Sequence, residues 1–142
     1  SKLMLKFFQN KENTKENFFS KIAALLIYAA KIDEVYSEEE EQIIKKTLLD
    51  LGAKNSEIDE VILNAKNLEK NSNQILDFTK EIKNMSEWDK RKIVESLWEI
   101  IYSNNNVDMF EANLMRRLAG LLYIDSKTMG EIKEKIQRKF KK

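Results

Sequence analysis

The chain contains no proline and only three glycines among its 142 residues. Folds built from strands and tight turns depend on these two residues, because proline fixes the backbone and glycine reaches conformations closed to other residues. A chain almost without them is suited to helix throughout. At this length about 70% of the unfolded surface can be buried, which is enough for a hydrophobic core. We therefore expect one all-α domain over residues 1–142, with residues 1–14 as a charged lead-in.

Apolar residues recur at helical spacing along the whole chain, which predicts a compact bundle of about seven helices. The first helix, in residues 15–32, has the middle AALLIYAA. This stretch is apolar nearly all round, so we expect the helix to be central and buried. Start and end signals delimit the others. The second helix starts with Ser37 and Glu40 and ends at Gly52, and the third starts with Ser56 and Asp59. The fourth bears Ile75, Phe78 and Ile82, and the fifth starts with Ser86 and Asp89. The sixth and seventh cover about residues 109–122 and 127–140.

The chain also contains an internal repeat, which predicts two helix–loop–helix halves at about 15–70 and 86–140. An offset of about 71 residues places Asp33 on Asn104 and aligns the helices that follow each. In each half, the break is the loop that follows a strongly apolar helix and precedes a helix that starts with acidic residues. The further matches are Ser37 with Asp108, Glu40 with Glu111, Leu51 with Leu122 and Ala53 with Ile124.

The two breaks resemble those of the TerB family, the bacterial tellurite-resistance-associated helical domain, over about residues 20–135. The first break reads AAKIDEVYSEEEEQII and the second reads LWEIIYSNNNVDMFEANLMRRLAGLLYI. In that family each half carries a loop of the form Asp-Gly-x-Val/Ile-x-x-x-Glu. The resemblance assigns these loop positions to Asp33 and Glu40 in the first half, and to Asn104 and Glu111 in the second.

Four positions depart from the family pattern. Glu34 and Asn105 stand where the loops would have glycine, and Asn104 replaces an aspartate. Tyr123 stands where a glycine commonly ends the sixth helix. The implied fold rests on the apolar pattern and is unaffected, whereas the implied acidic site has one carboxylate fewer. The resemblance implies a stress-related role, either linked to a cation or as a scaffold, with no established catalysis.

The sharpest functional hypothesis is a divalent-cation site formed by Asp33, Glu40, Asn104 and Glu111, with Asp108 as a further candidate. Calcium and magnesium prefer oxygen ligands from carboxylates, amides and backbone carbonyls, and both loops supply these groups. A shared site requires the two loops to meet in space. The alternative is that these residues only cap helices, because a glutamate at the third helical position completes a capping box without any ligand.

Composition excludes several other functions. The chain has no histidine and no cysteine, which leaves no Ser-His or Cys-His nucleophile, no ordinary zinc site and no Glu-x-x-His di-iron site. We therefore expect a protein that is not an enzyme. A net charge of +1 gives no general attraction to nucleic acid. No apolar run is long enough to span a membrane, and the lack of cysteine favours the cytoplasm.

A protein-interaction scaffold with no metal site is the alternative function, with an unidentified protein partner. Trp88, which is surrounded by charged residues, is the better candidate for an exposed anchor, whereas Trp98 belongs to an apolar helix and is expected in the core. The basic tail KEKIQRKFKK at 133–142 is expected to be a solvated helix end, because lysines suit a helix C-terminus. Peripheral membrane association and the oligomeric state are left open by the sequence.

Overall fold

The computed structural model describes residues 17–33, 36–72, 75–103 and 109–140, and these form helices and short connections with no strand among them. The expected all-α fold with seven helices is confirmed for this part of the chain. Short 3-10 helices cover Lys31–Asp33, Asn55–Glu57 and Ile82–Asn84. The α-helices are the first helix, described over 17–30, then α2 (Glu38–Asp50), α3 (Ile58–Asn71), α4 (Leu76–Thr79), α5 (Glu87–Ser103), α6 (Met109–Leu121) and α7 (Ser126–Phe140).

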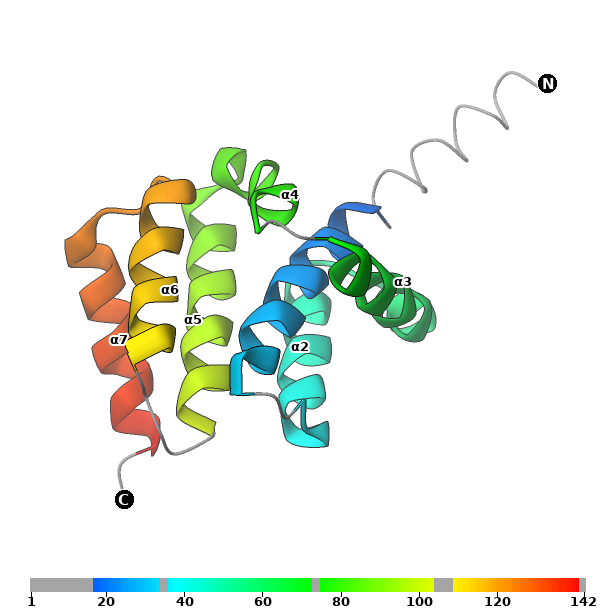
Figure 1. Cartoon of the computed structure of the whole chain (residues 1–142), viewed down its shortest axis with the longest axis horizontal. Helices are drawn as coiled ribbons and strands as arrows, with labels where there is room; N and C mark the ends of the chain where they lie inside the picture. The colour runs from blue at the N-terminus through cyan, green and yellow to red at the C-terminus, as the bar shows by residue number, and fades with distance from the viewer. Residues whose placement is uncertain (1–16, 34–35, 73–74, 104–108, 141–142) are drawn as a thin grey trace.

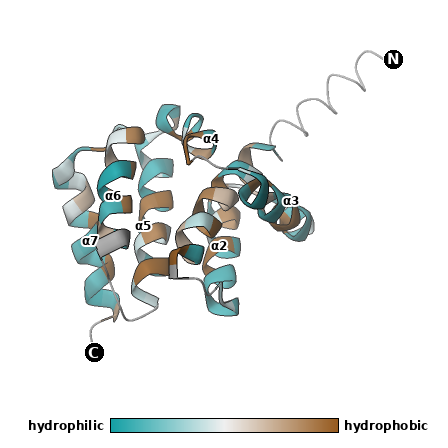
Figure 2. Cartoon of the chain, viewed as in Figure 1, coloured by the Kyte–Doolittle hydropathy of each residue, from teal (hydrophilic) through white to brown (hydrophobic). Residues whose placement is uncertain are grey.

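Helix α5 is the middle element of the bundle. It packs against α7 on one side and against α2 on the other, and α6 lies alongside α5 and α7 (Figure 1). Hydrophobic residues are concentrated in the first helix and in α5, while much of α7 is hydrophilic (Figure 2). Residues 22–27 of the first helix are all buried, as their continuous apolar sequence predicts. The core therefore lies where the first helix, α2 and α5 meet.

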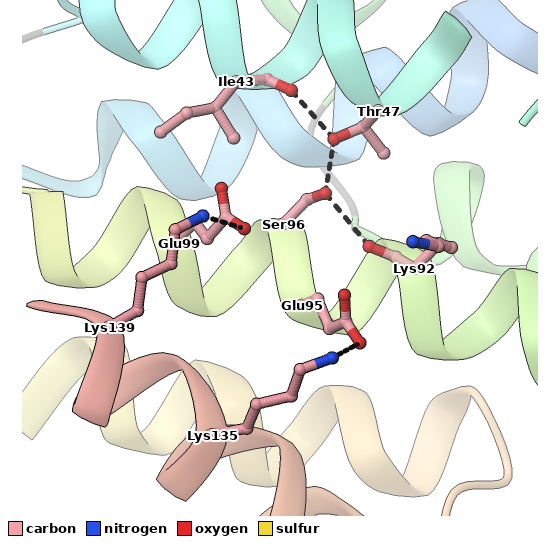
Figure 3. Close-up of polar contacts among 8 residues, drawn as sticks. All are labelled: Ile43, Thr47, Lys92, Glu95, Ser96, Glu99, Lys135 and Lys139. Atoms are coloured by element: carbon pink, nitrogen blue, oxygen red, sulfur yellow. Dashed lines mark hydrogen bonds and ion pairs between the residues drawn. The ribbon is translucent and has the colours of Figure 1, made fainter. Parts of the chain in front are cut away.

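Two hydroxyl groups join α2 to α5 within this apolar contact. The Thr47 and Ser96 hydroxyls form a short buried hydrogen bond with each other (Figure 3). Each is also within hydrogen-bonding distance of a carbonyl one turn earlier in its own helix, Thr47 with Ile43 at 2.8 Å and Ser96 with Lys92 at 3.0 Å. Both polar groups are thereby satisfied, which removes the cost of burying them.

Ion pairs join the opposite side of α5 to α7. Lys135 Nζ lies 3.0 Å from Glu95 Oε1, and Lys139 Nζ lies 3.3 Å from Glu99 Oε1 (Figure 3). Each residue of the second pair follows its counterpart by four positions, so the pairs stack one helical turn apart. The lysines are more than half exposed. Such exposed pairs add little free energy, and the apolar contact of Ile132 and Ile136 with the core carries this interface.

Helices α2 and α6 end with the same motif, 71 residues apart. Gly52 has φ +107° and Tyr123 has φ +56°, so both helices stop at a left-handed residue. In each case the left-handed residue and the one after it donate backbone hydrogen bonds back to the last turn, which is the Schellman motif. The donors and acceptors are Gly52 N to Leu49 O (3.0 Å), Ala53 N to Leu48 O (2.9 Å), Tyr123 N to Gly120 O (3.3 Å) and Ile124 N to Ala119 O (2.9 Å).

Two local expectations differ from the structure. Ser56 was expected to cap the third helix, but it lies within a 3-10 turn and α3 begins at Ile58 with no side-chain cap. The reason is that an N-cap residue needs extended backbone, whereas Glu57, the residue before α3, has φ −101° and ψ −14°. The fourth helix is also interrupted. It consists of the four residues of α4 and a separate 3-10 turn, although the three apolar residues expected there are buried.

The tryptophans lie as their sequence contexts predict. Trp98 is 4% exposed and its ring stacks with that of Tyr102, whereas Trp88 is 56% exposed with Lys92 over its ring. Phe140 then stacks on Tyr102, which fixes the end of α7 against α5. None of the helices in the described ranges has the length and hydropathy needed to cross a bilayer.

Candidate functional site

Glu40 is held at the start of α2 by the capping box predicted from the sequence. Ser37 has the extended backbone of an N-cap, with φ −89° and ψ 161°, and its hydroxyl accepts a hydrogen bond from Glu40 N at 3.1 Å. In return, Glu40 Oε1 accepts a hydrogen bond from Ser37 N at 2.8 Å. The Glu40 side chain is 0% exposed. Its carboxylate is therefore fixed in position and enclosed by the protein.

Glu111 holds the corresponding position in the second half. It is the third residue of α6, as Glu40 is the third residue of α2, and it is 4% exposed. Acidic residues that only stabilise a helix start are usually left in water, as Glu38 and Glu39 are in the first turn of α2. Enclosure of both glutamates is the property that separates them from the other acidic residues that the structure describes.

The structure describes the remaining predicted site residues only in part. The backbone of Asp33 ends a 3-10 turn, and its side chain lies outside the described part of the chain. Asn104 and Asp108 also lie outside it. Among the described residues, no three acidic side chains lie close enough together to hold a metal ion. Of the four predicted ligands, the structure therefore describes the side chains of Glu40 and Glu111.

The helix ends that border the two loops lie at one end of the molecule. In Figure 1 the end of the first helix, the start of α2, the end of α5 and the start of α6 are all at the lower end of the bundle. This follows from the repeat, because each half runs down an apolar helix, turns, and returns along a helix whose third residue is a glutamate. The arrangement puts Glu40 and Glu111 at the same end of the bundle.

A charged cluster beside Glu40 links the loop to α3. Lys66 Nζ lies 2.9 Å from Glu41 Oε1 and 5.7 Å from the centre of the Tyr36 ring, and Tyr36 Oη donates to Glu41 at 3.3 Å. Hydrogen bonding to Lys66 lowers the pKa of the Glu41 carboxyl. Burial raises the pKa of the Tyr36 hydroxyl, and the negative charges of Glu41 and Glu40 raise it further. Glu41 therefore stays ionised and Tyr36 stays a neutral donor near neutral pH.

Sequence reasoning did not identify this cluster. No local pattern connects Glu41 to Lys66, which lies 25 positions later in the sequence. The contact depends on how α3 crosses α2, and helix crossing is determined by packing. The cluster joins Tyr36 and the first turn of α2 to α3.

The carboxylate and amide oxygens at the matched loop positions are the ligand type that hard cations prefer, and the chain has neither histidine nor cysteine. The family model of Tellurite resistance protein TerB matches residues 20–134, which include both loops. No curated protein sequence and no solved structure matches the chain. The match covers most of the chain and both halves of the repeat, so this chain belongs to the TerB family.

Proposed function

We propose that this TerB-family chain is a stress-related cytoplasmic protein that binds a divalent cation, calcium or magnesium, without catalysing a reaction. The ligands are Asp33 and Glu40 from the first loop and Asn104 and Glu111 from the second. Carboxylate and amide oxygens are the ligands these two ions select. Convergence of the four bordering helix ends at one end of the bundle supports one shared site.

The single observation that carries the proposal is the burial of Glu40 and Glu111 at matched positions. Taking a carboxylate out of water is costly, and proteins tolerate it where the charge is paired or bound to a metal. A cap alone does not require burial. Ser86 caps α5 by accepting from Asp89 N at 3.2 Å while remaining exposed. A carboxylate has about four acceptor sites, so a cap hydrogen bond and a cation are compatible on the same glutamate.

Isothermal titration calorimetry with calcium and with magnesium tests the proposal. We expect saturable binding to the full chain, weakened at least tenfold in Glu111→Gln and in Asp33→Asn. Glu39→Gln is the matched control, because Glu39 is exposed in the same helical turn as Glu40 and should leave affinity unchanged. Absence of binding heat at millimolar ion, or equal loss in the control, contradicts the proposal.

A protein-interaction scaffold is the second candidate, and two exposed aromatic residues favour it. Trp88 is 56% exposed and Tyr123 is 67% exposed, with lysine nitrogens 5.1 and 5.8 Å from the ring centres. Exposed aromatics flanked by cations are frequent anchors in protein interfaces. Trp88→Ala should then abolish binding to a partner while preserving the helical spectrum and cation affinity. If calorimetry shows no ion and Trp88→Ala weakens partner binding, the scaffold function is the correct one.

A further inference from the structure

The two halves of the repeat correspond helix by helix in the structure. The bounds of α2 and α6 differ by 71 residues at both ends. The 3-10 turn and α3 of the first half correspond to α7 of the second, because Asn55 and Ser126 also begin these elements 71 positions apart. The first helix corresponds in the same way to α5. A contact in one half can therefore be compared with the residues at the equivalent positions of the other half.

Each apolar helix is joined, just before its loop, to the last helix of its own half. In the first half, Lys31 Nζ lies 2.9 Å from Glu69 Oε2 of α3. In the second half, the Tyr102 ring stacks on the Phe140 ring of α7, with 6.3 Å between the ring centres. Lys31 and Tyr102 are equivalent positions, and so are Glu69 and Phe140, because each set lies 71 residues apart. We name these two contacts the anchor pairs.

The first anchor pair holds the turn that carries Asp33. Lys31 and Asp33 belong to one 3-10 turn, so holding Lys31 also holds the backbone of Asp33. The Glu69 side chain is 12% exposed, the lowest value among the acidic partners in the ion pairs of the described residues. Three residues before Glu69 on the same face of α3, Lys66 pairs with Glu41 beyond the loop. One face of α3 therefore contacts the chain before and after Asp33.

The second anchor pair makes the same connection without charge. The Tyr102 ring lies between the ring of Phe140 and that of Trp98, whose centre is 5.8 Å away. Tyr102 precedes Asn104 by two residues, as Lys31 precedes Asp33. An ion pair and an aromatic stack differ in chemistry. What the two halves share is therefore the position of the contact, immediately before each loop.

A neighbouring contact of the same interface is not repeated between the halves. Lys135 of α7 pairs with Glu95, two helical turns before the second anchor pair. The equivalent residues of the first half are Asn64 and Ala24, and alanine has no group that could form such a contact. The contact that recurs is the one beside the loop.

We infer that the two anchor pairs are positioning contacts for the loop site, because they fix the chain two residues before Asp33 and Asn104. The inference rests on the proposed cation binding. It identifies four residues that control the affinity for the ion without contacting the ion themselves. They are Lys31 and Glu69 in the first half and Tyr102 and Phe140 in the second.

Two double variants that lose the same charges test the first anchor pair. Lys31→Ala with Glu69→Ala removes the contact, whereas Lys31→Tyr with Glu69→Phe replaces it by the pair of the second half. In calorimetric titration with calcium, we expect roughly threefold or greater weakening in the alanine variant, since contacts that orient metal ligands contribute to affinity. The aromatic variant should keep the parental affinity, and both should keep the parental helical circular dichroism.

Two further variants complete the comparison. Phe140→Ala changes no charge and should weaken calcium binding to a similar extent, because it removes the second anchor pair. The matched control is Lys21→Ala with Glu81→Ala, which removes an ion pair of the first helix at the end away from the loop. This control should leave calcium affinity unchanged. Parental affinity in the alanine variant of the first anchor pair overturns the inference and leaves cation binding intact, as does equal loss in its two double variants.

Amide hydrogen exchange of the ion-free chain separates this inference from the proposed function. The Asp33 amide should exchange faster in the alanine double variant than in the parent chain, and at the parental rate in the aromatic one. If the parent chain binds no calcium, the proposed function fails and these rates alone decide. Equal exchange of the Asp33 amide in the two double variants would then overturn the inference.

Discussion

Replacing Gly52 by alanine should destabilise the protein, whereas the same replacement at Gly130 should stabilise it. A Cβ atom built at either position has no other atom within 4 Å, so neither substitution changes packing. What differs is the backbone. Gly52 has φ +107° at the end of α2, and Gly130 lies inside α7 with helical backbone.

The magnitudes follow from the two conformations. Left-handed backbone costs a residue with a Cβ about 1–2 kcal/mol. Loss of unfolded-chain freedom on replacing glycine by alanine returns about 0.4–1 kcal/mol. Gly52→Ala should therefore lower the free energy of unfolding by about 1 kcal/mol. Alanine is better than glycine inside a helix by about 0.8–1.0 kcal/mol, so Gly130→Ala should raise the free energy of unfolding by that amount.

Urea unfolding followed by far-ultraviolet circular dichroism measures both variants against the parent chain. The two midpoints should move in opposite directions, with the slope of free energy against urea unchanged. A stabilising or neutral Gly52→Ala would refute the reasoning, because it would mean that α2 does not end in a left-handed residue. A destabilising Gly130→Ala would instead show that the exposed face of α7 is not ordinary helix.

Other predictions concern the helix contacts and caps. Thr47→Val and Ser96→Ala should each cost about 1 kcal/mol, but the double variant should cost less than their sum, because each single change leaves a buried hydroxyl without its cross-helix partner. Additive losses in urea unfolding would contradict this coupling. The Asp125 carboxylate accepts from Thr128 N at 2.7 Å, which holds the pKa of Asp125 below its usual range. Its contribution to stability is therefore present above the unfolded-state pKa of about 3.9 and is lost as pH falls through the lower folded pKa. A carboxyl-resolved NMR titration should give that lower value, and Asp125→Asn should reduce the acid dependence of unfolding; a pKa of Asp125 at or above the ordinary value would disagree.

Local chemistry made several features predictable from the sequence. The Ser37 and Glu40 cap and the Gly52 helix end depend on residues a few positions apart, so spacing alone identifies them. The family resemblance placed Tyr123 where a glycine commonly ends a helix, and the structure gives both Gly52 and Tyr123 positive φ. Tyr123 adopts this conformation although it has a side chain, with the Lys83 nitrogen 5.8 Å from its ring centre.

Features that depend on packing were not predictable in the same way. The spacing of Glu40 predicts a cap but says nothing about its complete burial, which arises from the helices around α2. The helical spacing of Asn64, Asn67 and Asn71 puts them on one face of a helix. That this face lines a groove depends on the first helix and α4, which supply its other walls. Sequence spacing describes one helix at a time, and both features are shared between helices.

The most direct test of the cation proposal is an amide-resolved NMR titration of the full chain with calcium and then with magnesium. We expect saturable shifts confined to the residues around Asp33–Glu40 and Asn104–Glu111, with both sets following one binding curve and both lost in Asp33→Ala. Such a result would mean that the two halves of the repeat hold one ion. Shifts in one loop alone would contradict the shared site, and no shift at millimolar ion would contradict cation binding altogether.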